Sequence, residues 1–202
     1  MIKKKSGIWT LLFISLYVLS NVALANEKDR HQHPDAHDQQ RLSIKLVGWS
    51  QAYTPGSGEG IIENVPNVEG DVVCQDVDMV DLHSNKVIAT STDCFSDVEP
   101  DSGGGAGFTG TSFLNFPDGT IISQGGFTAQ PVLRETTTID GVTITAITGE
   151  AAEGNTIIGG TGKYENSTGN VRVSGLINGE EYAFMPGDTM YFDCIFEIQL
   201  FD

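Results

Sequence analysis

Residues 157–177 read IIGGTGKYENSTGNVRVSGLI, a short apolar run, a glycine-rich turn and a second run in which apolar and polar residues alternate. Gly159, Gly160, Gly162 and Gly169 supply backbone conformations that other residues resist. After the turn, every second residue is apolar or glycine, as in a half-buried strand. This stretch therefore predicts a strand, a tight corner and a second strand.

The rest of the chain has the same character. From residue 42 onward Val, Ile, Thr and Phe are punctuated by Gly, Asp and Asn, and no window has the apolar stripe of a helix. The expected strands are 42–51, 71–82, 86–96, 106–116, 120–129, 142–149, 156–160, 169–177 and 189–201. Asp-Gly pairs at 118–119 and 140–141 favour tight hairpins, so sequence neighbours should pair antiparallel. Because closure removes exposed edges, we expect an all-β antiparallel barrel of about eight strands.

The N-terminus has the pattern of a secretory signal peptide over residues 1–25. Three lysines at 3–5 precede an apolar stretch at 8–18 and then Ala-Leu-Ala at 23–25. The apolar stretch is too short to span a bilayer comfortably. We therefore expect cleavage after residue 25, a secreted or periplasmic product without membrane insertion, and one folded domain over residues 41–202.

Residues 26–40 form an expected disordered tether, because they are rich in Asp, Glu, Gln and His and almost free of apolar side chains. His31, His33 and His37 lie in it. Their spacing suits a borderline metal, since His-rich tracts bind metals. The alternative is a solvated linker without metal, which we favour because a zinc site normally draws on ligands held by a folded frame.

The charge of the chain is strongly acidic. Removal of residues 1–25 takes three of the eleven basic residues and none of the 27 acidic ones, which changes the net charge from −16 to −19. Such a field repels phosphate backbones and anionic lipid surfaces, so we expect no nucleic-acid partner. The acidity indicates either solubility in a salty exterior, which we favour, or recognition of a cationic ligand.

Two of the three cysteines are expected to form a disulfide. A three-residue connection at 83–85, with Asn85 in a left-handed conformation, would place Val80 opposite Ile88 and Cys74 opposite Cys94. In an oxidising compartment such a pair is bonded, and the closed loop stabilises the fold by about 3 kcal/mol in the chain-entropy account.

The last expected strand has the clearest alternation of the chain. One face carries Phe192, Cys194, Phe196, Ile198 and Leu200, and the other carries Tyr191, Asp193, Glu197 and Gln199. The apolar face either fills the barrel or covers an oligomer contact, and alternating strands generally turn their apolar side inward. Cys194, left without a partner, should be a buried and inert thiol.

Two strings match nucleotide-binding patterns only in part. Residues 105–110 fit GxGxxG but precede no helix, and residues 160–163 lack the first Gly and the Ser or Thr of a P-loop. His83 is the only histidine of the expected domain and lies in a turn, which argues against a hydrolase triad. We expect no cofactor.

The corner GGTGKYENSTG resembles the closing motif of allene oxide cyclases and dirigent proteins. Glu-Gly-Asp-Val-Val at 69–73, and Phe-Leu-Asn-Phe at 113–116 followed by Asp-Gly, resemble other elements of that family. The resemblance implies an all-β, calycin-like, eight-stranded antiparallel barrel, often trimeric, with a largely apolar cavity and no metal or nucleotide. Family cyclases close a ring, and dirigent proteins steer a radical coupling.

The resemblance also suggests site residues, with departures from the family pattern. Cys94 matches a pocket cysteine of the cyclases, but a bond to Cys74 would make it structural. Arg172 either replaces a dirigent arginine that is Thr168 here or is an ordinary outward-facing residue. Asp76 and Asp78 share a strand face and either point into the cavity, where paired carboxylates suit acid-base work, or face solvent. Candidate ligand contacts are Phe113, Phe116, Tyr191 and Phe196.

Three functions follow for such a barrel. It holds a reactive hydrophobic molecule for isomerisation, cyclisation or coupling, it carries a hydrophobic molecule without reaction, or it is an interaction module with a packed interior. We expect an open cavity. Inward acidic or tyrosine side chains would favour the first function, and a filled interior the third.

Overall fold

The structure, a computed structural model, describes residues 39–150, 153–179 and 184–201. These residues belong to one compact unit that spans residues 36–202. The expected signal peptide and the three tether histidines lie outside the described residues. The first strand begins at Gln39, so residues 39 and 40 of the expected tether belong to it. In the described part, no helix is long and apolar enough to cross a membrane.

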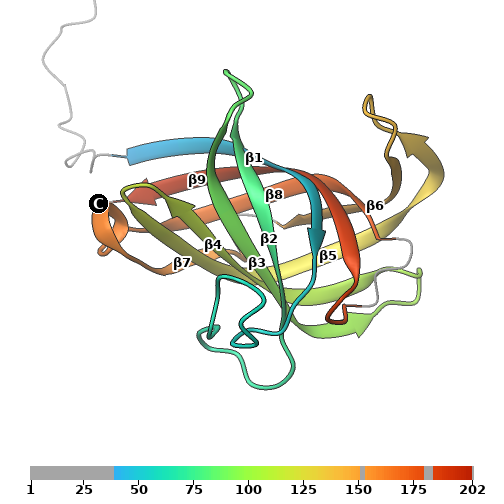
Figure 1. The fold of residues 1–202 in the computed structure, drawn as a ribbon, viewed down its shortest axis with the longest axis horizontal. Helices are drawn as coiled ribbons and strands as arrows, with labels where there is room; N and C mark the ends of the chain where they lie inside the picture. Colours follow the sequence, from blue (N-terminus) through green and yellow to red (C-terminus); the bar gives the residue numbers. More distant parts are fainter. Residues whose placement is uncertain (1–38, 151–152, 180–183, 202) are drawn as a thin grey trace, which may run out of the picture. The chain divides into compact units, whose positions relative to one another are not determined.

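Most of the described residues lie in nine strands, and one short 3-10 helix is present among them (Figure 1). The elements are β1 (Gln39–Gln51), β2 (Val73–Asp81), β3 (Val87–Pro100), β4 (Ala106–Phe116), β5 (Gly119–Thr137), β6 (Thr143–Glu150), β7 (Thr156–Gly160), η1 (Gly162–Tyr164), β8 (Thr168–Asn178) and β9 (Thr189–Phe201).

All strand pairs are antiparallel, and the sheet closes on itself. Each strand from β1 to β5 pairs with the next, β8 pairs with β9, and β9 returns to β1 along its whole length. Between β5 and β8 the barrel has one strand position that β6 and β7 occupy together, because each of them pairs with both β5 and β8. Nine strands therefore occupy eight positions, and the expected eight-stranded antiparallel barrel is confirmed.

One strand boundary was wrong by a wide margin. The expected strand at 120–129 is β5, which continues to Thr137 and forms a long hairpin with β6 at the right of Figure 1. Pro131 cannot donate a ladder hydrogen bond, but it lies at an irregularity in the β5–β6 pairing, so the strand runs past it. Leu133 and Ile139 of this hairpin are fully exposed.

The hydrophobic core has two parts on opposite sides of the barrel wall. The larger fills the barrel and includes the apolar face of β9, as expected from its alternation. The smaller lies outside the wall, where Val65 of the loop between β1 and β2 packs on Tyr53, Phe113 and the Cys74–Cys94 bond. The loop therefore covers the outer face of β2 to β4.

The disulfide between Cys74 and Cys94 is confirmed, and these residues are opposite each other on β2 and β3. The pairing expected nearer the hairpin was wrong, because Val80 faces Val87 rather than Ile88. A bulge between Met79 and Val80 shifts the register there by one residue and lengthens the turn. Asn85 has the expected left-handed conformation, with φ of 53°.

The glycine corner closes one end of the barrel. It joins β7 to β8 through η1, whose Tyr164 is buried against Phe116 with ring centroids 5.5 Å apart. A Cβ on Gly160 would lie 2.3 Å from the Tyr164 carbonyl oxygen, whereas a Cβ on Gly159 would meet nothing nearer than 4.0 Å. A side chain can therefore be added at Gly159 without a steric clash but not at Gly160.

We expect Gly160→Ala to lower the melting temperature by several degrees, because backbone atoms must move to admit the methyl group. The matched control Gly159→Ala adds the same methyl group to open space and should leave the melting temperature almost unchanged. Thermal unfolding followed by circular dichroism measures both. Equal losses in the two variants would contradict this role of Gly160.

Candidate functional site

A row of polar side chains crosses the inside of the barrel. Gln75 on β2 pairs with Asp93 on β3, Asp93 pairs with Ser112 on β4, and Ser112 pairs with Ser123 on β5. All four are buried. Directly paired residues lie on the same face of a sheet, so the side chains form one continuous row, here called the inner polar row.

Asp93 is the charged member of this row. Ser91 donates a hydrogen bond to its Oδ2 atom at 3.1 Å, and Ser112 donates to Oδ1. Burial raises the pKa of the Asp93 carboxyl to about 6, although the two serine hydrogen bonds lower it. Asp93 therefore exchanges its proton near neutral pH, in the range where a buried carboxyl can act as acid or base.

A second buried carboxyl lies where β6 ends. Glu150 is 8 % exposed, and its Oε1 atom would lie 2.0 Å from a Cβ on Gly125, so the absence of a side chain at 125 makes room for it. Burial raises the pKa of Glu150 to about 8. The Asn155 amide opposes that shift, but the two side chains make no hydrogen bond of ordinary geometry.

Several of these buried groups have no protein partner among the described residues. They are both amide atoms of Gln75, the Ser123 hydroxyl, both carboxyl oxygens of Glu150 and both amide atoms of Asn155. A buried polar group without a hydrogen bond costs about 1–3 kcal/mol. Such groups are usually satisfied by ordered water or by a bound molecule, so the interior can hydrogen-bond water or the polar atoms of a ligand.

The enclosed space beside the inner polar row is small. It measures about 30 Å³ and is lined by Asp93, Ser112, Thr148, Phe196 and Cys194, among others. This volume suits water molecules but not a drug-sized ligand. Burial raises the pKa of the Cys194 thiol, which agrees with the expected inert cysteine.

An aromatic cluster separates this space from the end of the barrel where β9 begins. Phe184 lies 5.8 Å from Phe95 and 5.5 Å from Phe108, and Phe108 stacks on Phe127 at 5.7 Å. Phe95 and Phe127 line the small space on the inner side. The four rings therefore divide the barrel interior from its mouth.

On the outer side of the aromatic cluster lies a larger hollow, here called the mouth basin. It measures about 510 Å³. Its lining comes from six strands and from neighbouring loops. It is apolar except for one threonine and backbone atoms, with Val98, Ala129, Ala146, Ile177, Phe184 and Met190 as representative members. Volume and lining both match those of small-molecule sites.

The polar residues singled out in the sequence lie outside the barrel. Asp76 and Asp78 are on the outer face of β2, the second of the two alternatives, with Asp78 exposed. Arg172 is exposed on the outer face of β8, where it pairs with Glu197 of β9. The structure brings none of the three to the inner polar row.

The aromatic candidates divide between the two sides of the wall. Phe196 lines the small interior space, and Phe116 packs against the main core. Phe113 belongs to the outer cluster beneath the β1–β2 loop. Tyr191 is on the outer face of β9, buried beside Trp49 with ring centroids 5.6 Å apart.

Sequence reasoning missed the two interior carboxyls. One carried a usable signal, because the register counted from the cysteines already placed Gln75 opposite Asp93 on the face of Val73 and Val77. An acidic residue on that apolar face could have been recognised as buried. Glu150 had no such signal, since it ends a strand beside a loop and its burial depends on where β7 re-enters the wall.

No group of three or more His, Cys, Asp or Glu side chains in the described ranges is placed to hold a metal ion. No family model and no curated protein sequence matches this chain. The arguments for its function therefore come from the barrel and from the residues themselves.

We expect the stability of the protein to fall as the pH rises from about 4.5 to about 8, because the folded state holds the Glu150 proton up to about pH 8. The unfolded carboxyl releases its proton near its ordinary value of 4.5, so between these values the folded state binds more protons. Each rise in pH then favours unfolding. Glu150→Gln is neutral at every pH and should flatten the fall in melting temperature.

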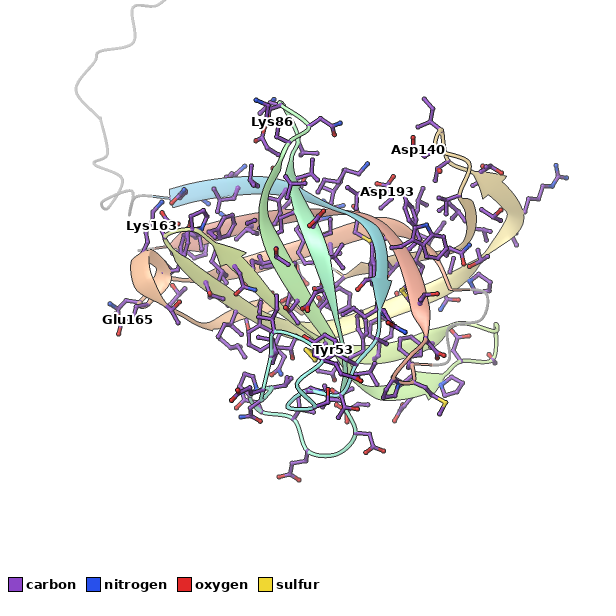
Figure 2. All side chains as sticks on the ribbon, viewed as in Figure 1. Tyr53, Lys86, Asp140, Lys163, Glu165 and Asp193 are labelled. Carbon is purple, nitrogen blue, oxygen red and sulfur yellow. A yellow bond between two sulfur atoms is a disulfide. The ribbon has the colours of Figure 1, made fainter. Side chains whose placement is uncertain are left out.

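The control is Glu165→Gln, which removes one exposed carboxyl from the turn at the left of Figure 2. It should leave the pH dependence of the melting temperature as in the unchanged protein. An equally steep fall in Glu150→Gln would show that Glu150 does not hold a proton in the folded state.

Proposed function

We propose that this chain is an exported barrel protein, of the allene oxide cyclase-like and dirigent-like kind, that binds a hydrophobic small molecule in the mouth basin. The observation that carries the proposal is the basin itself, a hollow of about 510 Å³ in which every lining side chain except one threonine is apolar. Single apolar residues on a surface are ordinary, but a concave apolar site of this size is typical of ligand binding.

The place of the basin in the fold supports the same proposal. Most of its lining belongs to six strands of the barrel, β3 to β6, β8 and β9, so its walls are fixed by the ladder hydrogen bonds of the barrel. Phe184 contributes to the basin and also contacts Phe95 and Phe108 beneath it. Aromatic rings give a ligand a large apolar contact surface that is already in place before binding.

Export is the second part of the proposal. The pattern of residues 1–25 supports it, and so does the disulfide between Cys74 and Cys94, because such bonds persist in oxidising compartments and are rare in a reducing cytosol.

Binding in the basin can be tested with Nile red, a neutral dye whose fluorescence rises in apolar surroundings. We expect saturable binding by the unchanged protein. Ala146→Phe places a phenyl ring in the basin and should weaken binding at least about tenfold, the effect of losing roughly 1.4 kcal/mol of contact.

The matched control is Ala89→Phe. Ala89 is also partly buried against the main core but pairs with Met79, away from the basin. This variant should bind the dye within about twofold of the unchanged protein. Equal weakening by both changes, or no saturable binding, would contradict a ligand site in the basin.

A second candidate function is acid-base catalysis of an isomerisation or cyclisation without a cofactor. Asp93 and Glu150 favour it, because burial raises both pKa values into the range of physiological proton exchange. The unpartnered amide groups of Gln75 and Asn155 would hold polar atoms of a substrate in one orientation. A substrate must pass the aromatic cluster to reach these groups, which a carrier does not require.

A retained ligand distinguishes the two functions. Compounds extracted from protein purified from its native compartment are identified by mass spectrometry and added back to ligand-free protein. A catalyst converts one of them to an isomer of unchanged mass, and Asp93→Asn or Glu150→Gln lowers the rate by about a hundredfold or more. A carrier returns every compound unchanged, which would exclude the catalytic function and leave the binding function intact.

A further inference from the structure

A third hollow lies on the outside of the barrel and shares no lining residue with the mouth basin. It measures about 760 Å³ and is bounded by the end of β1, by Tyr53 and Glu59, by Asp76 on β2, and by residues 186–187. Figure 2 shows Tyr53 at the lower end of the barrel, beside the loop that joins β1 to β2. We call this hollow the outer groove.

The wall of the outer groove is tied to the barrel by backbone hydrogen bonds. Gly187 donates its N–H to the Ala52 carbonyl at 2.8 Å, and Ala52 donates to the Asp188 carbonyl at 2.8 Å. The Gln51 side-chain amide also donates to the Gly187 carbonyl at 3.1 Å. These bonds fix the two sides of the groove relative to each other, so the hollow belongs to the fold.

Trp49 gives the outer groove an open aromatic surface. Its side chain is 59 % exposed on the outer face of β1, whereas its paired neighbour Tyr191 is 6 % exposed. The two rings are tilted at 57°, with centroids 5.6 Å apart, so Tyr191 supports the indole from one side. A large aromatic ring left open beside a concave surface is typical of a binding site.

The charge of the outer groove is negative. Asp76 and Glu59 line it, and the described lining includes no Lys, Arg or His. Tyr53 donates a hydrogen bond to Asp76 Oδ1 at 3.1 Å, and Thr92 donates to the same atom at 2.5 Å. Within the described residues no hydrogen bond reaches Asp76 Oδ2, so this atom can accept from a ligand.

The tyrosine of the groove reflects the same negative field. The pKa of Tyr53 is raised to about 12, first by burial and further by the charge and hydrogen bond of Asp76. Its hydroxyl therefore stays protonated and continues to hold the carboxylate in place. The position of the Asp76 charge is thus set by two hydroxyl donors before any ligand binds.

We propose that the outer groove binds an organic cation, an alkylammonium group whose methyl or methylene carbons lie on the Trp49 ring while Asp76 and Glu59 face the charge. A cation over an indole ring is attracted by the negative face of the ring, most strongly where water is displaced. The net charge of −16 increases the local concentration of cations around the whole protein. A neutral or anionic ligand would gain neither contribution.

Choline is the probe for this site, because it carries a quaternary ammonium group. The chain has two tryptophans, Trp9 and Trp49, and Trp9 lies within the expected signal peptide. In protein that begins at residue 26, the tryptophan fluorescence therefore reports Trp49 alone. We expect a saturable change on addition of choline at constant ionic strength. The uncharged carbon analogue of choline, dimethylbutanol, should bind at least about tenfold more weakly.

Asp76→Asn tests the charge while keeping an oxygen that accepts from Tyr53 and Thr92. It should weaken choline binding by about tenfold. Asp78→Asn is the matched control, since Asp78 is exposed on the same face of β2, two residues away, and does not line the groove. It should change the affinity by less than about twofold. Glu59→Gln, on an exposed loop residue, gives a second variant that leaves the Asp76 hydrogen bonds intact.

Three results would overturn the proposal. They are the absence of a saturable response, equal binding of choline and its neutral analogue, and equal weakening by Asp76→Asn and Asp78→Asn, which would mark a general charge effect. Ala146→Phe should leave choline binding unchanged, because Ala146 lines the mouth basin and not the outer groove. This site and the basin can therefore succeed or fail independently.

Discussion

The pairing of the first strand with the last holds this structure together. β1 and β9 are hydrogen-bonded from Gln39 opposite Phe201 to Gln51 opposite Thr189, and without this ladder the sheet would have two open edges. Closure turns one face of every strand inward, where it meets the inner faces of the opposite wall. The burial of the two carboxyls, the aromatic cluster and the two ends of the barrel all depend on this pairing of β1 with β9.

The closed wall separates two kinds of chemistry. Inside, Asp93 and Glu150 are kept from water, and their protonated forms are favoured by burial. Outside, Asp76 is partly exposed to solvent and accepts hydrogen bonds from two hydroxyl groups. β2 presents Gln75 to one side and Asp76 to the other, so adjacent residues of one strand serve different environments. The alternation of side chains along each strand therefore decides both which residues form the core and on which side of the wall each polar group lies.

The sequence was most informative where local patterns carry the answer. Alternation identified the strands, and counting from the β2–β3 turn paired Cys74 with Cys94 correctly despite the bulge at Met79. It failed where the answer depends on distant segments. The burial of Glu150 follows from the shared place of β6 and β7 in the wall, and the outer groove is assembled from four separate segments around Trp49. No periodicity or motif within a single stretch of sequence indicates which distant segments come together in the fold.

β6 and β7 occupy one strand position beside β5, and the ladder of hydrogen bonds along β5 is interrupted where its partner changes from one to the other. β5 is bonded to β7 as far as Gln124 and to β6 from Thr128, so residues 125–127 have no ladder partner on that side among the residues that the structure describes. Glu150 and Asn155 lie next to Gly125 in this unpaired stretch of β5. With fewer ladder hydrogen bonds, this part of the wall can open locally while the rest of the barrel stays folded, and such an opening would let the buried Glu150 carboxyl exchange its proton with solvent.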